Sequence, residues 1–339
     1  MSKLLSPKVL VPVAIVVVAI IFQAVFKIPG VILPEISIPA EPVLDLFGFT
    51  ITNTLLAAWL TMILLIVGCW LITRKMSMVP GRWQAALEMV IEGFYNMVEG
   101  AAGPKWTPRF FPIVMSIFLF VITASWLGLT PLMGGWGVLH HVEAGHEGYD
   151  VNWLNNSHSF GILVKGEQTA VEGEHAGEAE AEQYILAPML RASTTDMNFT
   201  LALAIVSVLL TQYFGLSSLG LGYLSKFIAV GGVAKAFRQP GLGCAGRIGA
   251  FFLGVIDIFI GIVETISEFG KIVSFSFRLF GNIFAGEVLL GVMAFLIPYI
   301  VSLPFFGLEL FVGLVQALVF MMLSVAFFVV AVSGHGEGH

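Results

Sequence analysis

Charged residues are scarce in this sequence of 339 residues, because Asp, Glu, Lys and Arg together make up only 11% of it. Hydrophobic residues make up 58%, and the mean hydropathy is +0.94. Soluble domains carry about 25% charged residues. The composition therefore excludes a soluble globular protein and predicts one that resides in a lipid bilayer.

Cysteine is almost absent, since Cys69 and Cys244 are the two in the sequence, so there is no disulfide framework and no pair of thiol ligands. The sequence also lacks a G-x-x-x-x-G-K-[ST] phosphate loop and an H-E-x-x-H zinc motif. Its histidines within 140–146 and in the C-terminal tail lie outside the apolar runs, and a solvated loop is favoured over a metal site. We therefore expect no catalytic residues, no metal and no cofactor.

Long apolar runs are what the sequence has in abundance. A run of about 18 residues or more crosses a hydrocarbon core of roughly 30 Å as a helix, which satisfies its own backbone polar groups. The chain is therefore predicted to be an all-α, polytopic membrane protein with about five or six membrane helices. The runs lie at 9–26, 51–73, 110–133, 199–214, 248–300 and 303–332.

The first 49 residues hold an apolar run and a proline-rich connection. The run follows Lys3 and Lys8, so it suits either a cleaved signal peptide or a retained anchor. No convincing A-x-A cleavage site follows it, which favours the anchor. The stretch 28–42 is expected to be extended, because prolines disfavour helix in the residues before them.

Charge placement divides the middle of the chain into three parts. Residues 50–133 hold two crossings joined by a segment, 82–103, that alternates apolar and acidic residues and suits an interfacial amphipathic helix. Residues 134–195 form an acidic insertion, with nine Asp or Glu against only Lys165 and Arg191. Residues 196–247 hold the fourth crossing and a basic loop.

The basic loops set the expected orientation. Arginine and lysine gather at 74–109 and at 226–247, and by the positive-inside rule both segments face the cytoplasm. The acidic insertion then lies on the opposite side of the membrane.

Residues 248–339 are expected to form a long helical hairpin. About fifty helical residues from 248 to 300 would extend roughly 75 Å, over twice the bilayer core. One upright helix cannot accommodate that length, so the segment must be broken, bent or strongly tilted. Pro298 and Pro304 bracket the turn to the last helix, because proline disrupts a helix interior.

Ionisable residues at membrane depth are costly and are functional candidates by default. Glu264, Lys271 and Arg278 recur every seven residues, and Ser274 and Asn282 lie four residues before and after Arg278, so all share one helical face. The hairpin holds seven such ionisable residues: Asp257, Glu264, Glu268, Lys271, Arg278, Glu287 and Glu309.

Arginine and carboxyl groups suit different roles in this hairpin. Arg278 stays protonated, so it cannot relay protons but can attract a carboxylate and repel a passing proton, as a gate would. Buried carboxyl groups can bind and release protons at physiological pH, so Glu264, Glu287 and Glu309 could line a proton path. Gln316, seven residues after Glu309, extends its polar stripe.

A purely structural interpretation of these charges stays open. In it, Glu264 pairs with Lys271 and Glu287 pairs with Arg278, and the pairs only fix helix packing.

A resemblance to a known family rests on the eleven residues from Phe277 to Glu287, Phe-Arg-Leu-Phe-Gly-Asn-Ile-Phe-Ala-Gly-Glu. This segment closely resembles the arginine segment of the a subunit of F-type ATP synthases. The resemblance extends upstream to Glu264 and downstream to 316–320, and more weakly to 196–198, so it covers the C-terminal third strongly.

The resemblance implies a non-catalytic stator subunit that moves protons for a rotary ATP synthase. Arg278 would face the carboxylate of a c-subunit ring and separate two half-channels; Glu287, Glu309 and Gln316 would border uptake, and Glu264 release. Lys271, Ser274 and Asn282 would support these residues.

The same resemblance implies the partners and the location. The partners would be the c ring, b-type peripheral stalk subunits, lipid and protons, with no nucleic acid, and the location would be the bacterial inner membrane. Carboxylates at both 287 and 309 resemble the chloroplast members. The N-terminal run and the acidic insertion depart from compact members.

A secondary transporter is the alternative function, because such proteins also use intramembrane charges and broken helices. That class would need an inverted repeat, and no second segment of the sequence matches the hairpin.

Overall fold

The computed structural model describes residues 40–46, 49–74, 76, 81–130, 133, 136–141, 150–153, 161–164, 184–220, 222–223, 227, 244–296 and 302–333. Several segments for which the sequence made predictions are not among these residues. The apolar run 9–26, nearly all of the proline-rich stretch, Pro298 and most of the basic loop 226–247 lie outside the described residues, as do His146 and the C-terminal histidines.

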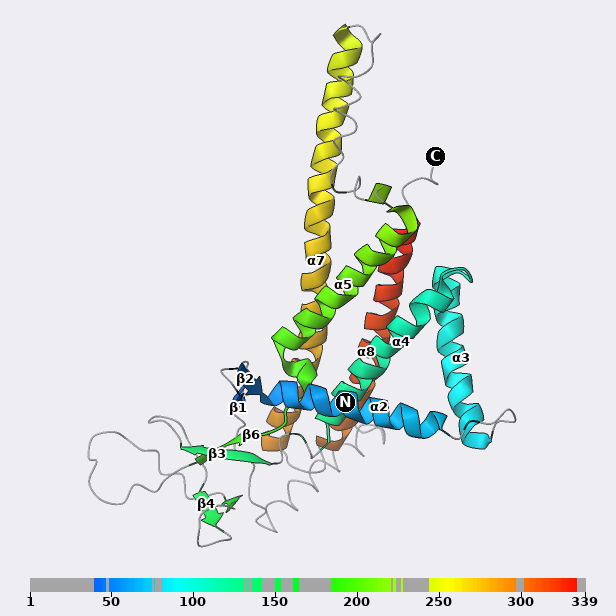
Figure 1. Ribbon diagram of the computed structural model, residues 1–339. Helices are drawn as coiled ribbons and strands as arrows, with labels where there is room; N and C mark the ends of the chain where they lie inside the picture. Colours follow the sequence, from blue (N-terminus) through cyan, green and yellow to red (C-terminus); the bar gives the residue numbers. More distant parts are fainter. Residues whose placement is uncertain are drawn as a thin grey trace, which may run out of the picture. The chain divides into compact units, whose positions relative to one another are not determined.

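Six α-helices make up most of the described chain, and Figure 1 shows them in sequence colours. Five of them, all except α3, are long and apolar enough to cross a membrane. The prediction of an all-α polytopic membrane protein is therefore confirmed. The helices are α2 (Asn53–Thr73), α3 (Arg82–Ala102), α4 (Thr107–Gly128), α5 (Met197–Leu219), α7 (Cys244–Leu296) and α8 (Ser302–Val332).

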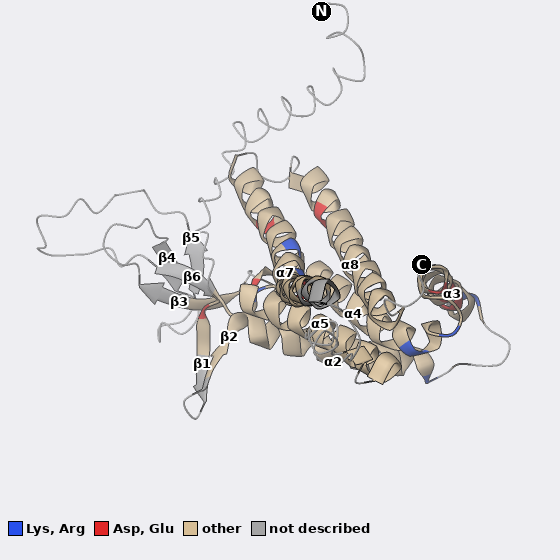
Figure 2. Ribbon diagram, turned by 90° about the horizontal axis from the view of Figure 1, so that it is seen from above, with Lys and Arg blue, Asp and Glu red and all other residues tan. Residues whose placement is uncertain are grey.

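The C-terminal hairpin is formed by α7 and α8, and α7 is one continuous helix of 53 residues. At 1.5 Å per residue it extends about 80 Å along its axis. Figure 2 views the first part of α7 end-on while its later part runs across the view, so the helix bends without breaking. Pro304 lies in the first turn of α8, where its missing N–H has no intrahelical partner to lose.

The packing divides the chain into two compact units. The first comprises Met1–Thr61, Ala124–Asp196 and Asn282–Gly313, and the second comprises Met62–Thr123, Met197–Gly281 and Leu314–His339. Helices α2, α4, α7 and α8 each contribute one part to either unit.

The described residues of the first unit form three small antiparallel sheets that hydropathy alone did not predict. They pair β1 (Pro42–Leu46) with β2 (Phe49–Thr52), β3 (Gly137–His141) with β6 (Tyr184–Pro188), and β4 (Asp150–Trp153) with β5 (Gly161–Val164). The acidic insertion therefore contains β-structure between its long connections.

Two hydrogen bonds tie the start of α2 to the end of this insertion. Asn53 Nδ2 donates to the Pro188 carbonyl at 3.2 Å, and Thr54 Oγ1 donates to Asp196 Oδ2 at 2.7 Å. Asn53, Thr54 and Asp196 are all buried, so each bond satisfies a polar group that water does not reach.

The second unit is packed around aromatic rings from three helices. Phe110 of α4, Phe214 of α5 and Phe328 of α8 form a triangle with centroid distances of 4.8, 5.0 and 5.3 Å. Ser207 and Ser324, both buried, share a hydrogen bond of 2.9 Å between α5 and α8. Small hydroxyl residues let membrane helices approach closely.

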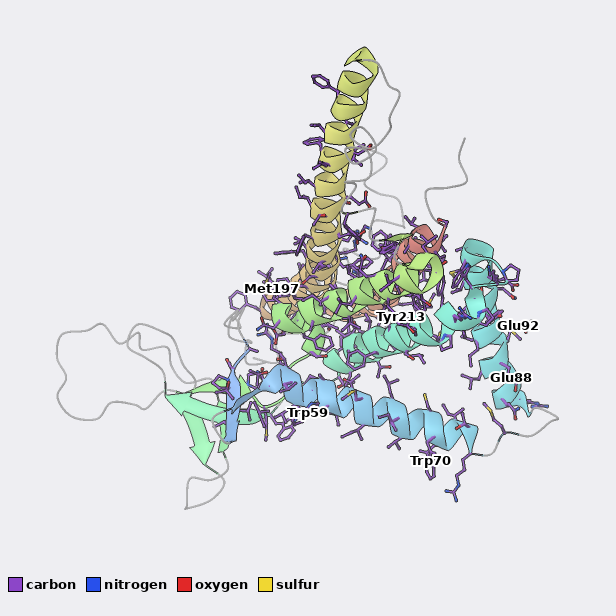
Figure 3. All side chains as sticks on the ribbon, turned by 45° about the horizontal axis from the view of Figure 1, so that its top comes forward. Trp59, Trp70, Glu88, Glu92, Met197 and Tyr213 are labelled. Carbon is purple, nitrogen blue, oxygen red and sulfur yellow. The ribbon has the colours of Figure 1, made fainter. Side chains whose placement is uncertain are left out.

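The exterior of the membrane helices is apolar, as lipid contact requires. Trp59 and Trp70 project outward from α2, and Tyr213 projects from α5 (Figure 3). Glu88 and Glu92 project from α3 in the same view, beside exposed apolar residues of that helix. This mixture suits the interfacial position predicted for α3.

The α5–α8 contact generates a stability prediction. Ser207→Ala removes one hydrogen bond, but Ser324 Oγ still donates to the Phe320 carbonyl, so we expect a loss of about 0.6 kcal/mol, the average for such bonds in a membrane. Ser207→Leu forces a larger side chain into a fully buried contact and should cost about 1–3 kcal/mol. Thermal unfolding in detergent measures both, and equal losses would contradict the close packing.

Candidate functional site

A pocket in the first unit brings Glu287 of α7 and Glu309 of α8 together. It has a volume of about 290 Å³. Both carboxylates lie near the turn of the hairpin, at the C-terminal end of α7 and the N-terminal end of α8. The lining residues are Ser125, Gly128, Leu129, Thr130, Met133, Pro188, Arg191, Ala192, Thr195, Ile283, Glu287, Leu290, Phe306 and Glu309.

Glu309 is the buried carboxylate of this pocket, with 7% of its surface exposed. Its carboxylate lies against the Cα of Gly286, where a Cβ would collide with it. The next residue, Leu310, accepts a hydrogen bond of 3.0 Å from Trp126 Nε1 of α4. A glycine on α7 and an indole on α4 therefore fix the position of Glu309.

Glu287 is more exposed, at 45% of its side chain, and it pairs with Arg191. The Arg191 Nη2 atom donates to Glu287 Oε2 at 3.2 Å, and the arginine side chain is only 11% exposed. Arg191 was not predicted as a site residue, because it lies 96 positions before its partner, in the insertion. Its one signal was that it is one of two basic residues in an acidic segment.

Arg278 belongs to the second unit, on the middle part of α7. Its Nη2 atom donates to Ser274 Oγ at 3.4 Å, one turn earlier, and its guanidinium lies 6.0 Å from the ring centre of Phe275. Its Nη1 atom is buried and has no hydrogen-bond partner among the described residues. Within the described part of this unit, no carboxylate lies within ion-pair distance of Arg278.

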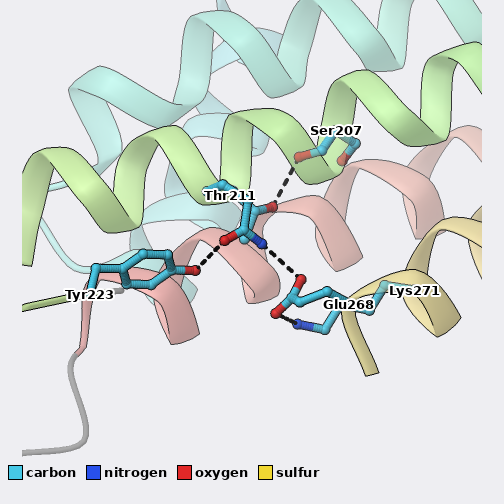
Figure 4. Close-up of polar contacts among 6 residues, drawn as sticks. Ser207, Thr211, Tyr223, Glu268 and Lys271 are labelled. Carbon is cyan, nitrogen blue, oxygen red and sulfur yellow. Dashed lines mark hydrogen bonds and ion pairs between the residues drawn. The ribbon is translucent and has the colours of Figure 1, made fainter. Parts of the chain in front are cut away.

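A second polar cluster in the same unit centres on Glu268 and is drawn in Figure 4. The Glu268 carboxylate accepts a bond of 2.7 Å from Lys271 Nζ and one of 3.0 Å from Gln212 Nε2 of α5. The Gln212 carboxamide oxygen in turn accepts a bond of 2.8 Å from the Tyr223 hydroxyl. We call these four residues the Glu268 network. Gln212 and Tyr223 were not predicted, and Glu268 was noted only as one of the ionisable residues.

The two ion pairs that the structural interpretation suggested are wrong. Lys271 pairs with Glu268 instead of Glu264, and Glu287 pairs with Arg191 instead of Arg278. Residues seven positions apart are separated by about 10.5 Å along a helix, whereas residues three positions apart are separated by about 4.5 Å. A shared helical face therefore does not bring two charges into contact.

The remaining predicted site residues differ in burial. Gln316 is buried in the second unit, with 4% exposed, and Glu264 is half-buried there. Asn282, in the first unit, is exposed. The structure thus places Glu287 and Glu309 in one pocket of the first unit, and in the second unit it places Arg278 beside Ser274. Among the described residues, no group of three or more His, Cys, Asp or Glu could hold a metal ion.

Comparison with known proteins decides the family. Residues 55–329, most of the chain, match the family described as ATP synthase A chain. The chain belongs to the ATP synthase A-chain family. It is 27% identical over 286 residues to ATP synthase subunit a of Moorella thermoacetica, covering 84% of this chain and 93% of that one. It is 28% identical over 287 residues to ATP synthase subunit a of Gloeobacter violaceus, covering 85% and 86%.

The family match extends well beyond the arginine segment, because it covers residues 55–329. The matched residues include all six described helices apart from the ends of α2 and α8. The chain is thus a multi-pass membrane component of an ATP synthase, which decides against the secondary transporter.

The geometry of Gly286 in this A chain generates a prediction. In Gly286→Ala the new methyl group collides with the Glu309 carboxylate, so Glu309 must move. Displacing a reacting group by about 1 Å can cost on the order of 100-fold. If Glu309 borders a proton path, as the resemblance implies, we expect ATP-driven proton pumping to fall by about tenfold or more. Fluorescence quenching of a pH dye in inverted vesicles measures the effect.

Gly281→Ala is the matched control for this substitution. Gly281 lies on the same helix, and a Cβ there would meet nothing within 4 Å. Equal pumping by the two variants would show that the close approach of Gly286 and Glu309 has no functional weight.

Proposed function

We propose that this chain is the proton-translocating stator subunit of a rotary ATP synthase. In this proposal, two half-channels exchange protons with carboxylates of a c-subunit ring, and Arg278 keeps the half-channels apart. The chain binds no nucleotide itself; catalysis belongs to other subunits of the complex.

The observation that carries the proposal is the incomplete pairing of Arg278. A guanidinium at membrane depth is costly unless a counter-charge or hydrogen bonds stabilise it. The described part of its own unit supplies the hydroxyl of Ser274, at the long distance of 3.4 Å, and the ring of Phe275, whose centre lies 6.0 Å away. A carboxylate from another chain is the group that would complete this environment, and a carboxylate on each ring subunit fits that requirement.

The pocket around Glu287 and Glu309 supports a role in proton uptake. It holds two carboxylates in a small cavity at the hairpin turn, the end of α7 that lies opposite the expected cytoplasmic basic loop. A proton entering here would pass to a ring carboxylate and neutralise it. Neutralisation removes most of the cost of moving that group into lipid, so the ring can turn.

The order of residues along α7 supports separate uptake and release. The helix begins beside the basic loop and reaches Glu264 first, then Arg278, and then Glu287. A permanently charged arginine thus lies between a carboxylate on the release side and one on the uptake side. After nearly a full turn, the ring carboxylate would release its proton near Glu264.

The energetics require this separation to be tight. The membrane potential contributes about 2.3 kcal/mol per proton per 100 mV, so several protons are needed for each ATP. A leak past Arg278 would dissipate that energy without rotation.

The proposed partners and location follow from the same assignment. We infer contacts with the c ring along α7 and α8, and with b-type peripheral stalk subunits that hold the chain still. The relatives named above are bacterial proteins, which supports a location in the bacterial cytoplasmic membrane.

Substitution of Arg278 tests the proposal directly. In Arg278→Ala, ATP-driven proton pumping should be lost with assembly intact, because the ring carboxylate has no cation to meet. Passive proton flow through the membrane sector, measured after removal of the catalytic head, should be retained. Both assays use inverted vesicles. Arg82→Ala, at an exposed position on α3, is the control for loss of a positive charge. Near-normal pumping by Arg278→Ala would refute the proposal.

The uptake pocket gives a second test. Glu309→Gln keeps the shape of the side chain but cannot exchange a proton, so coupled uptake should slow by about tenfold or more. Gln316→Leu alters a buried polar residue without losing a titratable group and should impair pumping less. The measurement is the pumping rate per assembled complex. Unchanged pumping by Glu309→Gln, or an equal defect in Gln316→Leu, would contradict the role of Glu309.

A further inference from the structure

We propose that Glu268 is a proton-exchange carboxylate of the release half-channel, and that Gln212 is the residue that positions it. This inference rests on the proposed function and adds a group to it. Glu268 is buried, with 7% exposed, and it lies ten residues before Arg278 on α7, between that arginine and the end of the helix that adjoins the basic loop.

The location of the other members of the Glu268 network points to the release side. Gln212 lies in the last third of α5, and Tyr223 follows the end of that helix at the start of the basic loop. The start of α7 adjoins the other end of the same loop. Since basic loops face the cytoplasm, the network lies toward the cytoplasmic side of the membrane.

Tyr223 is held in the Glu268 network by close packing against α5. Tyr223 is buried, with 5% exposed, and its ring lies directly against Gly215 of α5, where a Cβ would collide with the ring. Gly215 is one turn after Gln212, so the missing side chain lets the hydroxyl of Tyr223 reach the Gln212 carboxamide. The carboxamide then has its nitrogen directed to Glu268.

The cation that pairs with Glu268 has a second stabilising contact, on α8. Lys271 Nζ bonds its carboxylate at 2.7 Å and also lies 4.9 Å from the ring centre of Phe327 on α8. In the proposed step a proton passes from a ring carboxylic acid to Glu268. The O–H bond of the ring acid breaks, an O–H bond forms on the Glu268 carboxylate, and the negative charge moves to the ring group, while the Phe327 ring still stabilises the ammonium of Lys271. The proton then leaves to water, and the ion pair forms again.

The titratable groups near Glu268 include Lys271, which bonds its carboxylate, Tyr223, which bonds Gln212, and Glu264, which lies one turn earlier on α7. Gln212 and Phe327, which face the network from α5 and α8, carry no charge. Glu264 and Glu268 are thus two carboxylates on successive turns of one helix that a proton released from the ring could reach.

The test measures proton flow in inverted vesicles that carry the complete complex, divided by the amount of assembled complex. Glu268→Gln should slow ATP-driven pumping, and passive flow after removal of the head, by about tenfold. Glu268→Asp should recover most of that flow. The dependence of flow on the outer pH, which in these vesicles is the cytoplasmic side, should change shape in Glu268→Gln. Glu88→Gln, at an exposed position on α3, should change nothing.

A structural ion pair would give a different result. Glu268→Gln would then lower the amount of assembled complex, while the flow per complex and its pH profile stayed normal, and that outcome overturns the inference. If the Glu268→Gln variant does not assemble, Gln212→Leu tests the inference in its place, because this variant leaves the ion pair between Lys271 and Glu268 intact. It should slow flow and alter the pH profile, Tyr223→Phe should do so less, and normal flow in Gln212→Leu overturns the inference.

Comparison with Arg278→Ala separates the two proposals. Normal flow in Glu268→Gln together with lost pumping in Arg278→Ala would remove only the role of Glu268. Near-normal pumping in both variants would remove the proposed function and this inference together.

Discussion

The cost of holding charge within apolar helices is the constraint on which the rest of this structure depends. Few charges remain on α7 and α8 (Figure 2), and each is stabilised differently. Lys271 is met by Glu268 of its own helix, and Glu287 is met by Arg191 from the insertion. Glu309 is enclosed in a pocket. Lys271, Glu287 and Glu309 thus lie where a local partner or a cavity accepts their charge.

Small side chains make these arrangements possible. Lipid provides no hydrophobic force between helices, so close packing and hydrogen bonds must hold them together. The absent Cβ of Gly286 admits the Glu309 carboxylate, and that of Gly215 admits the Tyr223 ring. Gly313 of α8 approaches Ser125 of α4 in a similar way, since an added Cβ would lie 3.2 Å from the serine Cβ. In each case glycine places a larger functional or structural group.

Hydropathy predicted the crossings well, because crossing a membrane is chiefly a matter of apolar length. The predicted run 303–332 differs by one residue from α8, and the long run 248–300 corresponds to the single continuous helix α7. The third crossing ends at Gly128, earlier than predicted, before Pro131. Strands in the insertion escaped prediction, because polar composition indicates exposure and says little about short-range pairing.

The sequence predicted contacts between residues of one helix, but it did not predict contacts with residues from other helices or from the insertion. Spacing placed Arg278 beside Ser274 correctly, one turn apart. It could not find Arg191 or Gln212, which lie 96 and 56 residues from the carboxylates that they bond. A helical period says which residues share a face, whereas contact also needs proximity along the axis or a neighbouring helix.

Lys271 and Arg278, two cations of α7, are stabilised in different ways. Lys271 is already paired with Glu268 and lies over an aromatic ring, so it has little attraction left for a carboxylate from another chain. Arg278 has a weak hydroxyl contact instead. An arginine paired within its own chain would have to exchange that partner at every step of a rotor, and each exchange would add a barrier. In the proposed function, an incompletely satisfied guanidinium has no such barrier, so the incomplete pairing of Arg278 is the state that a ring carboxylate would need to meet.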